Sequence, residues 1–244
     1  IGLAIYSSVR SHFAYKAKLR KEALKEEVNS TVSKLRKATD TREALALFRE
    51  HSREELQSDL DFTAEVFGKA VNGFMNENLR ELRKVLTAVE EKKIHLKQVK
   101  RVGTLGVTQL DHDIAVEKGL YYYQGNDFAS EIIFSIRRLA EPLKDHIDNN
   151  FSPLSPVQKD DFGKVSEQII SFLRNCATMI RKNDYIGFEE LIAESITLMN
   201  QLTALKKGEL KRIQGQSGST KVSMVYLNMV QEAQNVVSFT ANLL

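Results

Sequence analysis

The strongest constraint on the fold is an apolar pattern that recurs every three or four residues along most of the chain. The C-terminal segment shows the pattern most clearly, because steps of four and three alternate there without a break. This spacing places the side chains on one stripe of an α-helix, and such a stripe must be buried against a neighbouring helix. The stripe consists of Val222, Tyr226, Met229, Ala233, Val236, Thr240 and Leu243.

Residues that interrupt helices are scarce in this chain. It has 12 Gly and 3 Pro among 244 residues, which is fewer than the turns of a strand-rich domain normally need. Strand and helix patterns do not alternate in the way that a parallel sheet requires. We therefore predict an all-α fold of antiparallel helical bundles.

A polar stretch with two prolines, Pro153 and Pro156, gives the clearest boundary in the chain. Proline cannot continue a helix from its interior, so helices should end before this stretch and begin after it. We predict three parts: a membrane-proximal helix and linker over residues 1–52, a first bundle over residues 53–150 and a second bundle over residues 157–244. Each bundle is expected to hold three long helices.

Further local signals are expected to end or bend helices before that boundary. A first helix, predicted over residues 3–37, should stop before Asp40, which forms a capping-box pattern with Glu43 three residues later. Glycine favours turns, and proline lacks the amide proton that a helix interior uses. The glycine and proline signals are Asn72–Gly73 and the pair Gly103 and Gly106, which predict turns, and Pro142, which predicts a kink or interruption.

Residue types that catalyse reactions do not converge in recognisable motifs. The sequence has no Gly-rich phosphate loop, nucleophile elbow or zinc-spaced set of Cys and His. None of its five histidines follows a glutamate by three residues, as ferritin-like metal sites require. The single cysteine, Cys176, lies on an apolar stripe and is predicted to be a buried structural thiol. We therefore predict that the chain is not an enzyme.

The one candidate metal site is a pair of acids, Asp127 and Glu131. Residues four apart lie on the same helical face, where like charges repel each other. A divalent cation with oxygen ligands could offset that repulsion. Other acid pairs share this spacing, but Phe128 and Ile132 place this one beside an apolar stripe. A solvated acidic face is the alternative explanation.

Basic residues are concentrated in two places, although the formal net charge is only +3. That small charge argues against nucleic acid as a partner. One concentration lies near the end of a predicted helix, where cations complement the negative helix terminus without any ligand. It consists of Lys92, Lys93, Lys97, Lys100 and Arg101.

The second concentration follows an apolar start over residues 1–6. This order is typical of the cytoplasmic flank of a membrane span, because Lys and Arg are costly to move across a bilayer. Residue 1 is Ile rather than Met, and the last helical pattern still runs at Leu244. We therefore expect a segment of a longer inner-membrane protein, lying in the cytoplasm after a transmembrane part of the same chain. The basic flank consists of Arg10, Lys16, Lys18, Arg20 and Lys21.

Two segments give the sequence a family resemblance. Residues 120–123 with residues 127–138, and residues 226–237, resemble the third helices of two PhoU-like half-domains. PhoU proteins are tandem three-helix bundles associated with phosphate uptake and its control. The resemblance covers about residues 53–244 and rests on helix layout more than on a sharp motif. With the basic flank, it is similar to the cytoplasmic extension of bacterial inorganic phosphate transporters of the PiT or sodium–phosphate symporter kind.

The resemblance also implies a metal signature in each half, an acid followed four residues later by Asp. In the first half Asp127 and Glu131 have that separation, with Glu in the final position. In the second half the matching region is Glu232 to Val236, where the second acid is absent and amides stand nearby. Amides are weaker ligands than carboxylates for a hard cation. The metal prediction is therefore limited to the first half.

The resemblance implies a regulatory or accessory domain that docks and biases gating, while transport occurs in membrane helices elsewhere. Its partners would be the transmembrane part of the same chain, a second copy forming a homodimer, or a cytoplasmic regulator. The alternative is a helical signalling module of a membrane receptor. Such a module should keep one heptad register over many turns and form an elongated parallel dimer, which small-angle scattering would distinguish from a compact bundle.

Overall fold

The computed structural model describes residues 40–108, 112–215 and 218–244, together with residues 15, 18, 19, 22, 23, 26, 30–35, 37 and 38. The chain divides into two compact units, a smaller one formed by Ile1–His51 and Lys97–Leu120 and a larger one formed by Ser52–Leu96 and Tyr121–Leu244. The three-part division at residues 52 and 150–157 stays a prediction.

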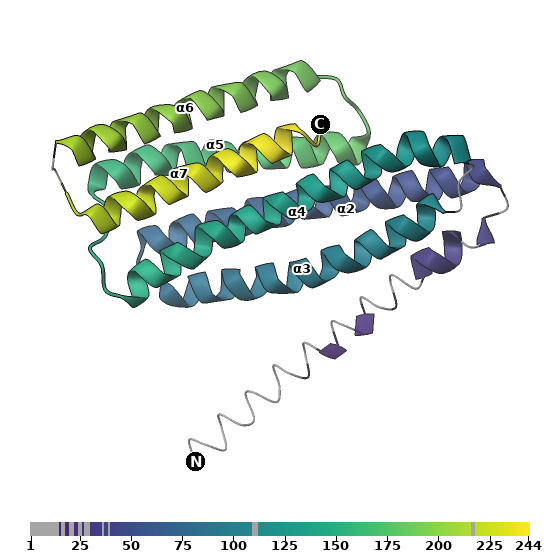
Figure 1. The fold of residues 1–244 in the computed structure, drawn as a ribbon, viewed down its shortest axis with the longest axis horizontal. Coiled ribbons are helices and arrows are strands. Elements are labelled where there is room, and N and C mark those ends of the chain that lie inside the picture. The colour runs from purple at the N-terminus through teal and green to yellow at the C-terminus, as the bar shows by residue number, and fades with distance from the viewer. Residues whose placement is uncertain are drawn as a thin grey trace, which may run out of the picture. The chain divides into compact units, whose positions relative to one another are not determined.

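The described residues form helices and no strands, which confirms the all-α prediction. Every described residue between positions 15 and 37 is helical, which agrees with the first predicted helix where it can be followed. The longer helices after it are α2 (Thr41–Met75), α3 (Leu79–Val107), α4 (His112–Asp148), α5 (Pro156–Lys182), α6 (Phe188–Gln214) and α7 (Thr220–Ala241) (Figure 1).

Two helix starts follow the capping chemistry of their sequences. The Asp40 carboxylate accepts a hydrogen bond from the Glu43 amide at 2.8 Å, so the predicted cap precedes α2. Ser155 precedes α5 in a capping box, in which its hydroxyl accepts from the Gln158 amide and the Gln158 side chain accepts from the Ser155 amide. The two-proline stretch therefore separates α4 from α5 as predicted.

The turn between α2 and α3 lies later than predicted. Asn72–Gly73 is inside α2, and the chain reverses at residues 76–78. There Glu77 is left-handed (φ 52°), its amide donates to Phe74 O, and the amide of Asn78 donates to Gly73 O. These two bonds form a Schellman motif, which satisfies helix-end carbonyls whichever residue supplies the left-handed position. The prediction was wrong because it relied on glycine alone.

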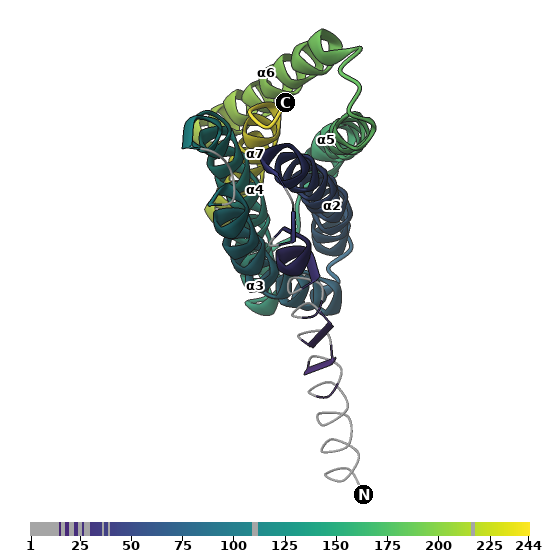
Figure 2. The same cartoon turned by 90° about the vertical axis from the view of Figure 1, so that its right-hand side faces the viewer.

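In the larger unit the six helices form two groups, one of α2, α3 and α4 and the other of α5, α6 and α7. Helices of one group pack against helices of the other. Helices α2 and α5 run antiparallel: the Lys159 ammonium donates to Met75 O at 2.7 Å, and Ile170 lies 3.0 Å from where a Cβ on Gly68 would be. Helices α4 and α7 are also antiparallel, with Phe128 stacked on Phe239. Two perpendicular views place α3 and α6 at opposite edges of this arrangement (Figures 1 and 2).

One apolar core joins the two groups in the larger unit. Its buried residues come from α2 through α7 and from Leu154 in the connection between the groups. A three-helix group would leave part of its apolar surface in water, and each group here covers the other. The largest fully buried side chains include Phe67, Leu82, Ile136, Phe162, Phe172 and Tyr226.

The smaller unit has a separate apolar contact between the start of α2 and the end of α3. Phe48 is 4% exposed, and its ring lies against the backbone of Gly106. A Cβ at position 106 would come within 2.6 Å of that ring. The turn predicted at Gly103 and Gly106 was therefore wrong: both glycines are inside α3, and Gly106 is small because Phe48 packs on it.

Replacing Gly106 by Ala should destabilise the smaller unit. The new methyl group would overlap the Phe48 ring, and overpacking of this kind costs about 1–3 kcal/mol. Hydrogen exchange at the amides in the last turns of α3 would report the loss. Gly208→Ala is the matched control, because a Cβ there meets nothing within 4 Å. In the middle of α6 this change should instead stabilise by about 0.5–1 kcal/mol. Equal effects of the two changes would contradict the packing explanation.

Candidate functional site

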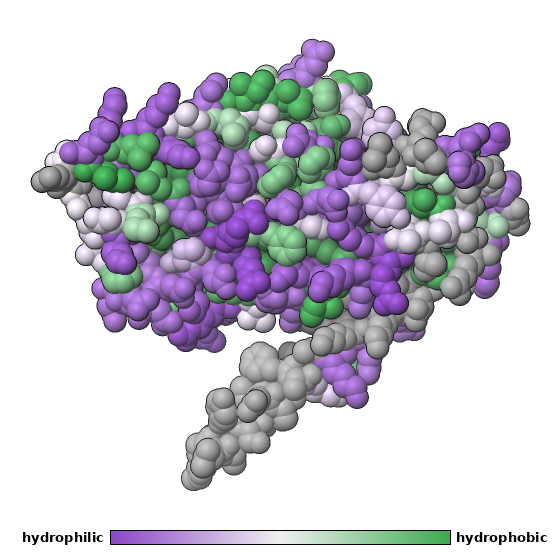
Figure 3. Space-filling view, viewed as in Figure 1, coloured by the Kyte–Doolittle hydropathy of each residue, from purple (hydrophilic) through white to green (hydrophobic). Residues whose placement is uncertain are grey.

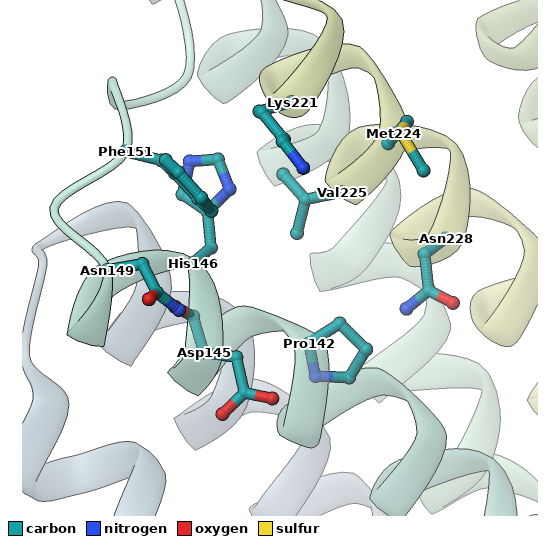
Figure 4. Close-up of a pocket in the computed structure, with 9 residues that line it drawn as sticks. All are labelled: Pro142, Asp145, His146, Asn149, Phe151, Lys221, Met224, Val225 and Asn228. Carbon is teal, nitrogen blue, oxygen red and sulfur yellow. The ribbon is translucent and has the colours of Figure 1, made fainter.

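A groove in the larger unit lies where the end of α4, the connection to α5 and the first turns of α7 meet (Figure 4). Its volume is about 380 Å³, within the range of ligand pockets. From α4 and the connection it is lined by Pro142, Asp145, His146, Asn149 and Phe151, and from α7 by Lys221, Met224, Val225 and Asn228.

The wall of the groove is positioned by the end of α4. Asn150 adopts the left-handed conformation (φ 54°), its amide donates to Ile147 O, and the Phe151 amide donates to His146 O. This is a second Schellman motif, and it brings the side chain after the turn back onto the last helical turn. The rings of His146 and Phe151 consequently meet edge to face with centroids 5.3 Å apart.

His146 is a structural part of this wall. It is 5% exposed and its ring also contacts Phe74 edge to face at 5.5 Å. Its Nε2 lies 2.8 Å from Ser152 O, and because a carbonyl oxygen only accepts, Nε2 carries the proton. A second hollow of about 330 Å³, also lined by His146 and Phe151, adjoins the groove. The two rings therefore stand between two hollows.

The charges at the groove are unevenly balanced. The Lys221 ammonium lies 5.4 Å from the centre of the Phe151 ring, a favourable cation–π distance. Asp145 instead pairs with Lys144 at 2.7 Å. Within the described ranges no carboxylate forms an ion pair with Lys221. Met224, which also lines the groove, is 61% exposed. On the face that carries α4 and α7, hydrophilic side chains separate the apolar patches from one another (Figure 3).

The groove continues into a polar seam between α4 and α7. Pro142 has no amide proton, so the carbonyl of Arg138 one turn earlier loses its helical donor. The side-chain amide of Asn228 on α7 donates to that carbonyl at 3.0 Å. The helix therefore continues through Pro142 to Asp148, and the predicted interruption does not occur. A bond from the other half of the unit replaces the missing one.

The predicted metal residues lie on α4 beside this seam. Asp127 is exposed, and Glu131 has its carboxylate 3.5 Å from the Arg138 guanidinium. Glu232 on α7 contacts the same guanidinium at 3.0 Å. The structure thus brings Glu131 on α4 and Glu232 on α7 to one arginine, which contacts both carboxylates. No sequence pattern indicated Arg138 as their partner.

No three His, Cys, Asp or Glu side chains among the described residues converge in a way that could hold a metal ion. Likewise, no helix in the described ranges has the length and apolar character needed to cross a bilayer. Of the basic flank, Lys18 is described: it is exposed and lies 3.9 Å from Glu22. Arg10, Lys16, Arg20 and Lys21 lie outside the described residues.

An ion pair and a histidine–carboxylate hydrogen bond inside the larger unit connect α2 to α3. Lys92 Nζ lies 2.6 Å from the Asp59 carboxylate, and His95 Nε2 lies 2.6 Å from the Glu55 carboxylate. Burial raises the pKa of Asp59, and the charge of Lys92 opposes that rise only in part. Lys92 belongs to the basic patch identified in the sequence near the end of this helix, and its side chain is 10% exposed and paired with Asp59. In the sequence, the feature that could have indicated this ion pair is the position of Asp59 next to Leu60, a residue of the apolar stripe.

Glu209 is a buried carboxylate that connects α5, α6 and α7. It accepts hydrogen bonds from Ser223 Oγ at 2.6 Å, Arg212 Nη1 at 2.8 Å and Gln158 Nε2 at 3.0 Å. Burial by itself would raise the pKa of Glu209, but these donors together lower it below the ordinary value. The ionised carboxylate is therefore the form that the fold stabilises.

Cys176 is a free, fully buried thiol, as predicted. Burial raises the pKa of Cys176 to about 12, and the negative charge of Glu194 adds to the rise. At neutral pH the thiol is therefore protonated, which makes it a poor nucleophile.

Comparison with known protein families, with curated proteins and with solved structures found no match. The groove, the seam and the pairing of helices are therefore the features that bear on function.

Glu209→Gln should destabilise the chain in a pH-dependent way. A lowered folded-state pKa stabilises the fold above the unfolded pKa, and this contribution disappears as pH falls through the folded pKa. At neutral pH we expect a loss of about 1–3 kcal/mol in unfolding free energy. In acid the wild-type carboxyl is protonated too, so the difference should shrink. Urea unfolding at several pH values would measure it, with exposed Glu167→Gln as the control. A difference that is constant with pH would contradict the assignment.

Proposed function

We propose that this chain is a helical regulatory domain, PhoU-like in arrangement, that docks on the membrane part of an inorganic phosphate transporter and biases its gating. The domain would lie in the cytoplasm and perform no catalysis. Its partner would be the transmembrane part of the same parent chain, and a second copy of the domain is a further candidate.

The observation that carries the proposal is the matched pairing of helices in the larger unit. The first helix of each group pairs antiparallel with the other, and so do the third helices. Such pairing is what two tandem, related three-helix halves would produce. It agrees with the family resemblance at α4 and α7, whose matching segments meet at Arg138. A long receptor stalk with one continuous register would have no reason to pair in this way.

The groove is the docking surface that suits this proposal. Its apolar lining includes Phe151, Met224 and Val225, and Lys221 supplies a positive charge that no carboxylate balances within the described ranges. A protein segment with an acidic residue next to a large apolar one would complement it. We assign that segment to the membrane part of the parent protein.

Docking changes transport only if the domain binds one conformation of the transporter more tightly than another. A difference of 1.4 kcal/mol between the two affinities shifts the conformational equilibrium by about tenfold. The common core of the larger unit suits this role, because a close-packed interior has low compressibility and transmits strain.

Removing residues 22–244 from the parent transporter should change the regulation of uptake but preserve transport itself. Phosphate uptake would be measured in reconstituted vesicles across a range of phosphate concentrations, with and without the domain. We expect the response to phosphate to change while some uptake remains. Unchanged uptake with an unchanged phosphate response would contradict the proposal.

Charge reversal at the groove should weaken docking. Lys221→Glu would repel an acidic segment, and we expect binding of the isolated domain to vesicles carrying the transmembrane part to become roughly five-fold weaker, or about 1 kcal/mol. Lys207→Glu on α6 is the control, because this exposed lysine has the same charge and does not line the groove. Equal weakening by both variants would indicate general electrostatic attraction and would count against the groove.

A further inference from the structure

The seam between α4 and α7 contains a charge that needs a partner. The Glu232 side chain is 8% exposed, and an ionised carboxylate at such a site is costly unless it is paired and hydrogen-bonded. Glu131 across the seam is 44% exposed, so water solvates part of its charge. Glu232 is therefore the carboxylate that needs a positively charged partner, and Glu131 adds a second negative charge nearby.

Arg138 meets this requirement with all three nitrogens of its guanidinium. Nε donates to Glu232 Oε2 at 3.0 Å, Nη2 donates to Ser135 Oγ at 2.9 Å, and Nη1 lies 3.5 Å from Glu131 Oε2. A planar guanidinium can contact two carboxylates and a hydroxyl at once, which a point-like ammonium does less well. The arginine side chain therefore connects α4 to α7 and balances charge on both helices.

The neighbouring polar groups are arranged for a carboxylate and not for a metal ion. Asn235 directs its amide nitrogen to Glu232 at 3.0 Å, so it acts as a donor there. Ser135 accepts from Arg138 and donates its proton to Glu131 O at 2.8 Å, which uses its only proton and one of its two lone pairs. A hard divalent cation needs six or more oxygen ligands. The donor set around Glu232 does not fit such an ion.

We propose that Arg138 is a built-in cation of the α4–α7 seam, which occupies the position that a divalent metal would need in order to bridge Glu131 and Glu232. The seam is consequently closed without metal, and divalent cations do not bind at it. This inference concerns the chain itself and is independent of the proposed transporter.

The test compares thermal unfolding of the 244-residue chain with that of two neighbouring variants. Wild type should melt at the same temperature in chelator and in millimolar Mg²⁺, Ca²⁺ or Mn²⁺. Arg138→Gln leaves Glu232 buried without its cation, so its melting temperature should fall by roughly 4–10 °C. Divalent cations should then restore part of that loss, because the two carboxylates become available to them.

Arg137→Gln is the matched control. Arg137 adjoins Arg138 on α4, but its partners Glu90 and Glu141 are about half exposed, so water can replace the lost cation. This variant should lose little stability and gain nothing from metal. In Arg138→Gln combined with Glu232→Gln, the recovery by metal should disappear.

A measurement on wild type covers the case in which Arg138→Gln does not fold. The Nε proton of Arg138 should give a side-chain NMR resonance protected from exchange, unchanged by Mg²⁺ or Ca²⁺ and lost in Glu232→Gln. Displacement of this resonance by either cation, or stabilisation of wild type by metal, would overturn the proposal. So would a folded Arg138→Gln that responds to metal no more than Arg137→Gln does.

Discussion

Six helices in the larger unit bury their apolar stripes in one common core, and the other features of the unit depend on this sharing. Neither three-helix group covers its own stripes, since core residues come from both groups and from the connection between them. Burial of apolar surface therefore holds α2 against α5 and α4 against α7, as well as the helices of each group against one another. The seam and the groove lie where that common core reaches the surface.

Polar groups near the common core are constrained as well, because a charge buried there needs a partner. Apolar packing alone tolerates helices that slide by one turn, whereas a buried charge must keep its partner. Asp59 with Lys92 sets α2 against α3, Glu209 sets α6 against α5 and α7, and Glu232 with Arg138 sets α7 against α4. Each polar contact thus selects one register among several that the apolar stripes would allow.

The parts of the fold that depend on neighbours in sequence could be predicted. The stripes of α5, α6 and α7, the cap at Asp40 and the boundary at Pro153 and Pro156 all follow from local spacing and backbone chemistry. Glycine was a weaker guide, because its role depends on what packs against it. Gly106 reads as a turn in isolation, but it lies inside α3, where the lack of a side chain leaves room for the ring of Phe48, 58 positions earlier.

The polar sites could be predicted only in part for the same reason. Glu131 was identified from its spacing to Asp127, but one of its neighbours at the seam, Glu232, is about one hundred residues away. Pro142 was expected to kink or interrupt α4, and the hydrogen bond that its missing amide proton would have made is replaced by one from Asn228 on another helix. A charged residue beside an apolar stripe is the general signal for such sites, and its partner is found only in three dimensions.

Gln158 has a double role whose consequence is mechanical. The same side chain accepts from the first amide of the α5 cap and donates to Glu209 inside the bundle. A pull on the connection between α4 and α5 that unwound the first turn of α5 would also remove a donor from an interior anion on α6. Unwinding this turn therefore costs more free energy than the turn alone contributes, because the Glu209 carboxylate would lose a hydrogen-bond donor at the same time.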